Sequence, residues 1–189
     1  MDFKIIIGLI LGIIIGILAA SLIPAAAPAP QPQCPTSIDA IKKRGVLVLG
    51  TSADWPPYEY VEGGAIVGID IDIARKIAQS LGVKLEVRDM KFSALIEAVK
   101  RGDVDIVLAD MAITPDREGQ VLFSIPYQVD SSVVIAKRGA RIQNIEDLRG
   151  KAVGVQVGTV QEDWAAKNLG NISKIIRYDK VYPYMVEAL

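Results

Sequence analysis

A long hydrophobic run opens the chain. Every position from 5 to 23 is apolar, glycine or serine, and no charge occurs between Lys4 and Asp39. As a helix rising ~1.5 Å per residue, this run spans roughly 28 Å, close to the hydrocarbon thickness of a bilayer. The pattern therefore predicts a membrane segment over residues 1–23. Its length favours an uncleaved anchor, whereas the small residues at 25–27 suit cleavage of a signal segment.

A proline-rich linker is predicted over residues 24–37. Its sequence contains PAAAPAPQPQCP and carries no charge, which is typical of an extended, semi-rigid spacer. The only cysteine of the chain, Cys34, lies in this linker, so no intrachain disulfide can form. We interpret Cys34 as a free thiol, with an interchain disulfide or a lipid attachment as the alternatives.

From residue 38 onward the hydrophobic pattern alternates between helical and strand periods. Apolar residues recur every four positions from Ile73 to Leu81, which predicts a helix that Asp70 caps and Gly82 ends. Gly63-Gly64 predicts a hairpin turn. We expect further strands at 46–49, 83–87, 106–108, 132–136, 153–155 and 175–176, and further helices beginning at Ser93, Asn144, Thr159 and Pro183. Helices that alternate with buried strands predict an α/β fold with mostly parallel sheets.

Charge and composition narrow the function classes. Lys plus Arg number 21 and Asp plus Glu number 22, so the net charge of −1 gives no general attraction to nucleic acid. The chain has no histidine. His-dependent catalytic triads and His-ligated metal sites are therefore excluded, and we expect no metal and no nucleic-acid partner.

The segment Thr114-Pro115-Asp116-Arg117 has the composition of a helix start, with a capping residue and a proline at the first helical position. Arg117, however, is a cation at the positive end of that helix. A guanidinium beside free backbone N–H groups forms a strong carboxylate site. A surface arginine that pairs with Glu118 fits the sequence equally well.

Two turns after predicted strands are further candidates. Gly158, before the capping residue Thr159, either allows the backbone to approach a ligand or only forms a turn. The loop from Ser52 to Tyr58 follows the first strand, where open α/β sheets bind ligands. Its Trp55 packs either on the domain or against a ligand, because aromatic faces serve both roles.

The segment Gly68-Ile69-Asp70-Ile71-Asp72-Ile73 resembles the signature of solute-binding proteins for polar amino acids, the receptors of ATP-driven importers. The similarity begins near Ile41 and follows the family's order. It includes Asp54 to Tyr58, Phe92 with Leu95-Ile96, Thr114 to Arg117, Phe123 to Tyr127, Leu148 to Lys151, and Val155 to Gln161. Each motif is weak alone, but the ordered set is specific.

This resemblance implies an α/β, two-lobed periplasmic-binding-protein-like fold, with the ligand between the lobes. We expect the first lobe over 38–136 and the second over 137–189, with the second lobe and the C-terminal return incomplete in this chain. The implied function is extracytoplasmic binding of a polar amino acid and its delivery to the permease of an ABC importer. No enzymatic activity and no cofactor are expected. The location is the outer side of the cell membrane, or the periplasm or medium if the signal is cleaved.

The family's site residues carry over by position. Trp55 matches an aromatic residue that stacks on the ligand, and Phe92 matches an apolar wall. Arg117 matches the arginine that pairs with the ligand's α-carboxylate. Asp110 and Ala112 fall where the family contacts the α-ammonium and carboxylate groups. Second-lobe contacts are implied for Gly158, Thr159, Val160 and Gln161.

Three positions depart from the family pattern. Ala112 stands where a hydroxyl is common, Asp110 where a small residue is common, and Ser52 where some cation-binding members carry an acid. We expect a polar or basic ligand rather than an acidic one, because Asp110 would repel a second carboxylate.

Two other function classes use the same fold. A sensory input domain would need a further transmembrane span and a cytoplasmic domain. A dehydratase would need a positioned general acid, for which Glu59, Glu97 and Asp110 are the candidates.

Overall fold

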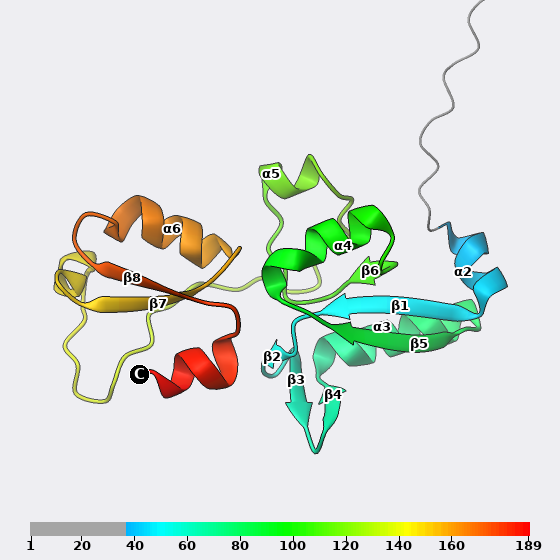
Figure 1. Ribbon diagram of the computed structural model, residues 1–189, viewed down its shortest axis with the longest axis horizontal. Helices are drawn as coiled ribbons and strands as arrows, with labels where there is room; N and C mark the ends of the chain where they lie inside the picture. Colours follow the sequence, from blue (N-terminus) through cyan, green and yellow to red (C-terminus); the bar gives the residue numbers. More distant parts are fainter. Residues whose placement is uncertain (1–36) are drawn as a thin grey trace, which may run out of the picture. The chain divides into compact units, whose positions relative to one another are not determined.

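The computed structural model describes residues 37–189 (Figure 1). The predicted membrane segment, most of the linker and Cys34 lie outside the described residues. Within 37–189, no helix is long and apolar enough to cross a membrane.

The first lobe is built on a parallel sheet in the order β5-β1-β6. Its central strand is β1 (Val46–Thr51), flanked by β5 (Lys84–Asp89) and β6 (Ile106–Val107). Successive side chains of a strand point to opposite faces. Leu49 packs against Ala74 on one face, whereas Val48 packs against Ala98 on the other. The helices α3 (Ile69–Leu81) and α4 (Leu95–Arg101) therefore cover opposite faces of this sheet.

The helix α2 (Ile38–Arg44) precedes β1 and shares the α3 face, since Ile41, Leu47 and Ala78 form one buried cluster. A separate antiparallel sheet joins β2 (Asp54–Trp55), β3 (Glu59–Glu62) and β4 (Ala65–Val67). Its turn at Gly63-Gly64 has positive φ at both residues, which confirms the predicted hairpin. This hairpin leads from the sheet into α3 (Figure 1).

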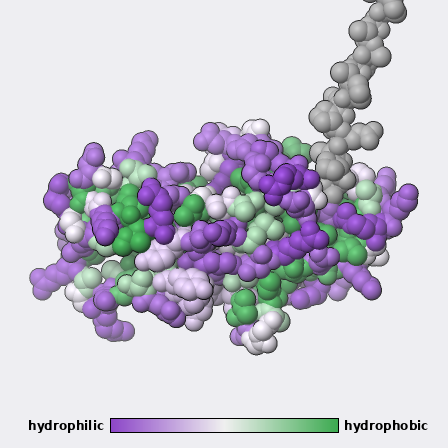
Figure 2. Space-filling view, viewed as in Figure 1, coloured by the Kyte–Doolittle hydropathy of each residue, from purple (hydrophilic) through white to green (hydrophobic). Residues whose placement is uncertain are grey.

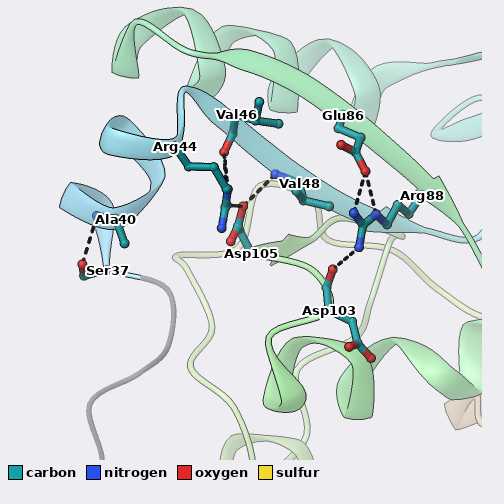
Figure 3. A network of polar contacts seen from close by, with 9 residues as sticks. All are labelled: Ser37, Ala40, Arg44, Val46, Val48, Glu86, Arg88, Asp103 and Asp105. Carbon is teal, nitrogen blue, oxygen red and sulfur yellow. Dashed lines mark hydrogen bonds and ion pairs between the residues drawn. The ribbon is translucent and has the colours of Figure 1, made fainter.

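A polar network fixes the start of the β1 sheet (Figure 3). The Asp105 carboxylate accepts a hydrogen bond from the Val48 amide at 2.7 Å and pairs with Arg44. Arg44 also donates to the carbonyl of Val46 at 3.1 Å. The Asp105 side chain is only 2% exposed. Its hydrogen bond to the strand therefore contributes more to stability than the solvent-exposed ion pairs around it.

The second lobe holds β7 (Ala152–Gln156) and β8 (Lys174–Tyr178), which pair in parallel. The helix α6 (Val160–Leu169) buries Ala165 and Leu169 against Val155, and the short helix η2 (Ile145–Leu148) adds Leu148 to this core. On the other side of β7, a Cβ at Gly154 would lie 3.1 Å from Met185, so η3 (Val181–Met185) packs there closely.

Between β6 and η2 lie α5 (Pro115–Glu118) and a long segment without regular structure. The strand predicted at 132–136 is absent, because no neighbouring strand among the described residues pairs with this β-branched run. Apolar side chains in this segment join neither core: Leu122 is 97% exposed and Val129 is 90% exposed. Figure 2 shows hydrophobic patches among the mainly hydrophilic residues of the visible face.

Two predicted helix starts are wrong. Gly68 rather than Asp70 precedes α3, and Asp70 lies buried in the first turn. Ser93 lies within the 3₁₀ turn η1 (Phe92–Ala94), and α4 begins after Ala94 without a side-chain cap. The last helical segment includes Val181, but the backbone of Tyr182 is extended, at φ −108 and ψ 136, so the continuous helical run begins at Pro183 as predicted. At α3 the capping rule failed because the amides of Ile69 and Asp70 donate to carbonyls of the loop before β3.

Candidate ligand site

Arg117 is held at the start of α5 by its own helix cap. Thr114 accepts a hydrogen bond from the Arg117 amide at 3.3 Å, which fixes the turn. The Arg117 side chain is 8% exposed and donates to two backbone carbonyls, that of Ala112 at 2.7 Å and that of Gly158 at 2.9 Å. Burial lowers the pKa of Arg117. No ion pair within residues 37–189 includes Arg117, so the alternative of a surface pair with Glu118 is wrong.

The half-buried ring of Phe92 lies beside this guanidinium, with 5.5 Å from Arg117 Cζ to the ring centroid. That separation is within the range of a cation–π interaction. The ring limits the directions from which a ligand reaches the remaining Arg117 donors. Phe92 and Arg117 come from segments on either side of β6, and the structure brings them together as the predicted site requires.

Gly158 and Thr159 form the turn between β7 and α6. Gly158 has φ +81, and a Cβ there would lie 3.0 Å from the Cα of Ser93. This close approach places the Gly158 carbonyl in reach of Arg117. The Thr159 hydroxyl donates to the carbonyl of Gln156 at 2.8 Å and accepts from the amide of Glu162 at 3.2 Å.

The helix α6 begins after the capping residue Thr159, as predicted. The carboxylate of Glu162 accepts from the amide of Gly158 at 2.8 Å rather than from Thr159. The first turn of a helix leaves the amides of residues such as Val160 and Gln161 without intrahelical partners. The side chain of Gln161 donates to the Ser132 hydroxyl at 3.0 Å. The turn therefore offers backbone donors, while its polar side chains are already engaged.

Trp55 and Asp110 form a second group of predicted site residues. The indole Nε1 donates to Asp110 Oδ2 at 3.1 Å, and Trp55 is 36% exposed. Asp110 is the one non-glycine residue with positive φ (+43) among the described residues. Burial raises the pKa of the Asp110 carboxyl. Ala112, two residues on, is exposed and contributes its carbonyl to Arg117.

Ser52 is placed differently from the other predicted residues. It is 1% exposed, and its hydroxyl donates to Asp54 Oδ1 at 2.8 Å. The side chain therefore supports the loop through Asp54. No contact joins it to Arg117 or Asp110 among the hydrogen bonds of residues 37–189.

Several polar residues near this loop are buried, which the sequence did not predict. Asp54 accepts hydrogen bonds from the side chain of Gln156 at 3.0 Å and the amide of Val181 at 2.6 Å. Glu59 and Asp70 are 1% and 0% exposed, and burial together with the charge of Asp70 raises the pKa of Glu59 to about 10. The polar character of the loop was visible in the sequence, but the distant partners were not.

Residues 47–182 match the family of bacterial extracellular solute-binding proteins, family 3. The chain belongs to this family. It is 46% identical over 117 residues to the arginine-binding extracellular protein ArtP of Bacillus subtilis, covering 62% of this chain and 46% of that protein. It is 32% identical over 149 residues to the cyclohexadienyl dehydratase of Pseudomonas aeruginosa, covering 76% of this chain and 56% of that enzyme.

Solved structures show the same fold. The substrate-binding protein AbpA from Streptococcus pneumoniae, bound to L-arginine, has a TM-score of 0.74 at 34% identity, covering 80% of this chain and 65% of that one. The holo form of ArgBP from T. maritima has a TM-score of 0.70 at 39% identity, covering 80% and 67%. These matches confirm the predicted family and the two-lobed α/β fold. The chain spans about half the length of the curated relatives it matches.

Proposed function

We propose that the protein is an extracytoplasmic receptor that binds a polar amino acid and delivers it to the permease of an ABC importer. The observation that carries this proposal is the burial of the Arg117 charge without a counter-charge among the described residues. Its buried guanidinium donates to two carbonyls and has no carboxylate partner among the described residues. A buried charge is costly without a counter-charge. The α-carboxylate of a free amino acid supplies that charge in a geometry suited to a guanidinium.

A basic amino acid, and arginine first, is the proposed ligand. Asp110 adds a carboxylate beside the indole of Trp55, where a cationic group of the ligand gains an opposite charge and an aromatic face. An acidic side chain at this place would be repelled by Asp110. Two of the similar proteins support the same ligand class, since their names or titles refer to arginine.

The proposed location is the outer side of the cell membrane, with residues 1–23 as the anchor. The family supports an extracellular location. Mass spectrometry of the mature protein tests the anchor: retention of the N-terminal residues supports it, and a start at or after residue 26 favours a cleaved signal.

The surroundings of two of the three candidate acids, Glu59 and Glu97, argue against a role as general acid in dehydration. Glu59 is 1% exposed, so it is closed off from a substrate. Glu97 is exposed and pairs with Lys100 at 2.6 Å on α4. Asp110 accepts from Trp55 at 3.1 Å. A general acid must reach the group that it protonates, and Asp110 alone of the three borders the site.

Calorimetry with arginine and argininamide tests the function. Arg117→Ala should weaken arginine binding by about 2 kcal/mol or more, roughly thirtyfold, and abolish the preference for arginine over its amide. The matched control is Arg75→Ala, which removes an exposed arginine paired with Asp72 on α3. Arginine binding by Arg117→Ala at the affinity of the unchanged protein would overturn the assignment.

A further inference from the structure

The first turn of α3 is joined to the loop before β3 by two backbone hydrogen bonds. The amide of Ile69 donates to the carbonyl of Pro57 at 3.1 Å, and the amide of Asp70 donates to that of Tyr58 at 3.0 Å. Gly68 makes this approach possible: its φ is +127, and a Cβ would overlap the Tyr58 carbonyl. The start of the helix is thereby held against the hairpin.

This packing buries two acidic side chains together. Glu59, the first residue of β3, is 1% exposed and Asp70 is 0% exposed. Glu59 Oε2 and Asp70 Oδ1 have no hydrogen-bond donor among the described residues. Two ionised carboxylates only accept hydrogen bonds, so neither satisfies the other. One proton on Glu59 resolves this, because the resulting O–H donates to Asp70 and removes a like-charge pair from a buried place.

Within residues 37–189, the main influences on the ionisation of Glu59 all favour its protonated form. Burial is the strongest influence on its ionisation, followed by Asp70 on α3, and then by Asp110 after β6 and Asp54 in β2. The hydroxyl of Tyr127, from the segment after α5, donates to Asp70 at 3.0 Å. Each of the three carboxylates favours the protonated form of Glu59.

The other oxygen of Asp70 leads to the candidate ligand site. Asp70 Oδ2 accepts the amide of Asp110 at 3.0 Å, as well as the Tyr127 hydroxyl. Asp110 has its backbone in the left-handed region, at φ +43, and its carboxylate accepts the indole N–H of Trp55. Hydrogen bonds thus run from Asp70 through Asp110 to Trp55, and a proton on Glu59 would extend this series to Glu59.

We propose that Glu59 carries a proton that it donates to Asp70, and that this shared proton positions Asp110 and Trp55 for the ligand. An ionised Glu59 would repel Asp70, and the Asp110 amide would lose its acceptor. The positioning role rests on the proposed function, because Asp110 and Trp55 belong to the ligand site only under that proposal. The protonation of Glu59 stands independently of it.

Infrared difference spectroscopy of the ligand-free protein at neutral pH tests the proton. The protein should show the carbonyl stretch of a buried carboxylic acid, and Glu59→Gln should remove it. Asp70→Asn should remove it as well, since an Asn amide donates to an ionised Glu59 and makes the proton unnecessary. Glu62→Gln, an exposed glutamate on the same strand, should leave the band unchanged. A band that persists in Glu59→Gln would overturn the assignment.

Arginine binding by the same variants tests the positioning role. Glu59→Gln keeps a donor to Asp70 and should bind arginine within about threefold of the unchanged protein. Glu59→Leu has no donor and should lose about tenfold or more in affinity, with thermal melts confirming that it is folded. Equal affinities for both variants, or an unfolded Glu59→Gln, would contradict the positioning role.

The two proposals fail in different ways. If the protein binds no amino acid but the infrared band is present and Glu59-dependent, the proposed function is wrong and the shared proton stands. If arginine binds and depends on Arg117 while the band is absent, the receptor function stands and the inference about Glu59 is wrong. Arg117→Ala serves as the reference, since it should lose binding and keep the band.

Discussion

Asp54 and Gln156, 102 positions apart in the chain, meet in a buried hydrogen bond of 3.0 Å between Oδ2 and Nε2. The same Asp54 oxygen accepts the amide of Val181 at 2.6 Å, and the other accepts the hydroxyl of Ser52. Burial raises the pKa of Asp54. One carboxylate in β2 therefore joins the loop that carries Trp55 to the end of β7 and to the start of η3.

Removal of this carboxylate should destabilise the protein. Asp54→Ala leaves the Gln156 amide and the Val181 N–H without their acceptor in a buried place, so the free energy of unfolding should fall by about 2–4 kcal/mol. Urea denaturation measures this change. The control Asp72→Asn removes an exposed carboxylate from α3 and should cost less than about 1 kcal/mol. Equal losses for the two variants would rule out a structural role for Asp54.

The pH dependence of stability should report Glu59. Its pKa rises from an ordinary 4.5 to about 10 on folding, so the folded state holds a proton that the unfolded state has released. Between these two pH values the folded state binds more protons than the unfolded state. The contribution of Glu59 to the free energy of unfolding therefore falls as the pH rises. Below pH 4.5 both states hold the proton and the contribution is fully present.

Glu59→Gln removes this titration and should flatten the decline. Denaturation curves of the two proteins at several pH values measure the difference in unfolding free energy. As the pH rises from about 5 to 9, the Gln variant should become more stable relative to the unchanged protein. A difference that is constant over this interval would show that Glu59 has the same pKa in both states.

The close approach of α3 to the hairpin should depend on Gly68. Gly68→Ala combines a strained positive φ with a Cβ that overlaps the Tyr58 carbonyl, and should cost about 3 kcal/mol or more of stability. Gly63→Ala is the matched control, since its φ of +59 is also positive but nothing lies within 4 Å of the added Cβ. Its cost should be about 1 kcal/mol. Equal costs in thermal or urea unfolding would show that backbone strain alone accounts for both.

The contact between Gly158 and Ser93 should affect ligand binding. A Cβ at Gly158 would lie 3.0 Å from Ser93, so Gly158→Ala must displace the carbonyl that accepts from Arg117. Arginine affinity should fall about tenfold or more. Gly150→Ala has a similar φ of +72 with nothing within 4 Å, and its affinity should stay within about twofold. Calorimetry on both variants distinguishes the contact from the backbone effect.

Local patterns predicted those parts of the fold that neighbouring residues determine. The alternation of apolar and polar residues at 83–87 predicted β5, and the glycine pair at 63–64 predicted the hairpin. Thr159 caps α6, as its position before the helix predicted. In each case the hydrogen bonds or the buried face depend on residues a few positions away. The strand predicted at 132–136 failed because a strand also needs a partner, which its own composition does not reveal.

The candidate site was predictable in its residue types and less so in its contacts. Arg117 stood out as a cation at a helix start, but its bond to the carbonyl of Gly158 joins residues 41 positions apart. Asp70 is a residue type that often caps helices, yet its carboxylate accepts a hydrogen bond from the backbone amide of Asp110, 40 positions away. Sequence patterns over a few residues carry no signal for such pairs.

If Asp110 contacts the ligand as proposed, its left-handed backbone limits how ligand preference can diversify. At a φ of +43, Gly, Asn and Asp are tolerated, whereas most other residues lose stability, β-branched ones most of all. The usual route to a new selectivity, exchange of a contact residue for a larger or differently shaped one, is therefore nearly closed at this position. Lineages that inherit this backbone should change their ligand range through neighbours such as Trp55 and Ala112, and laboratory libraries should concentrate their diversity there.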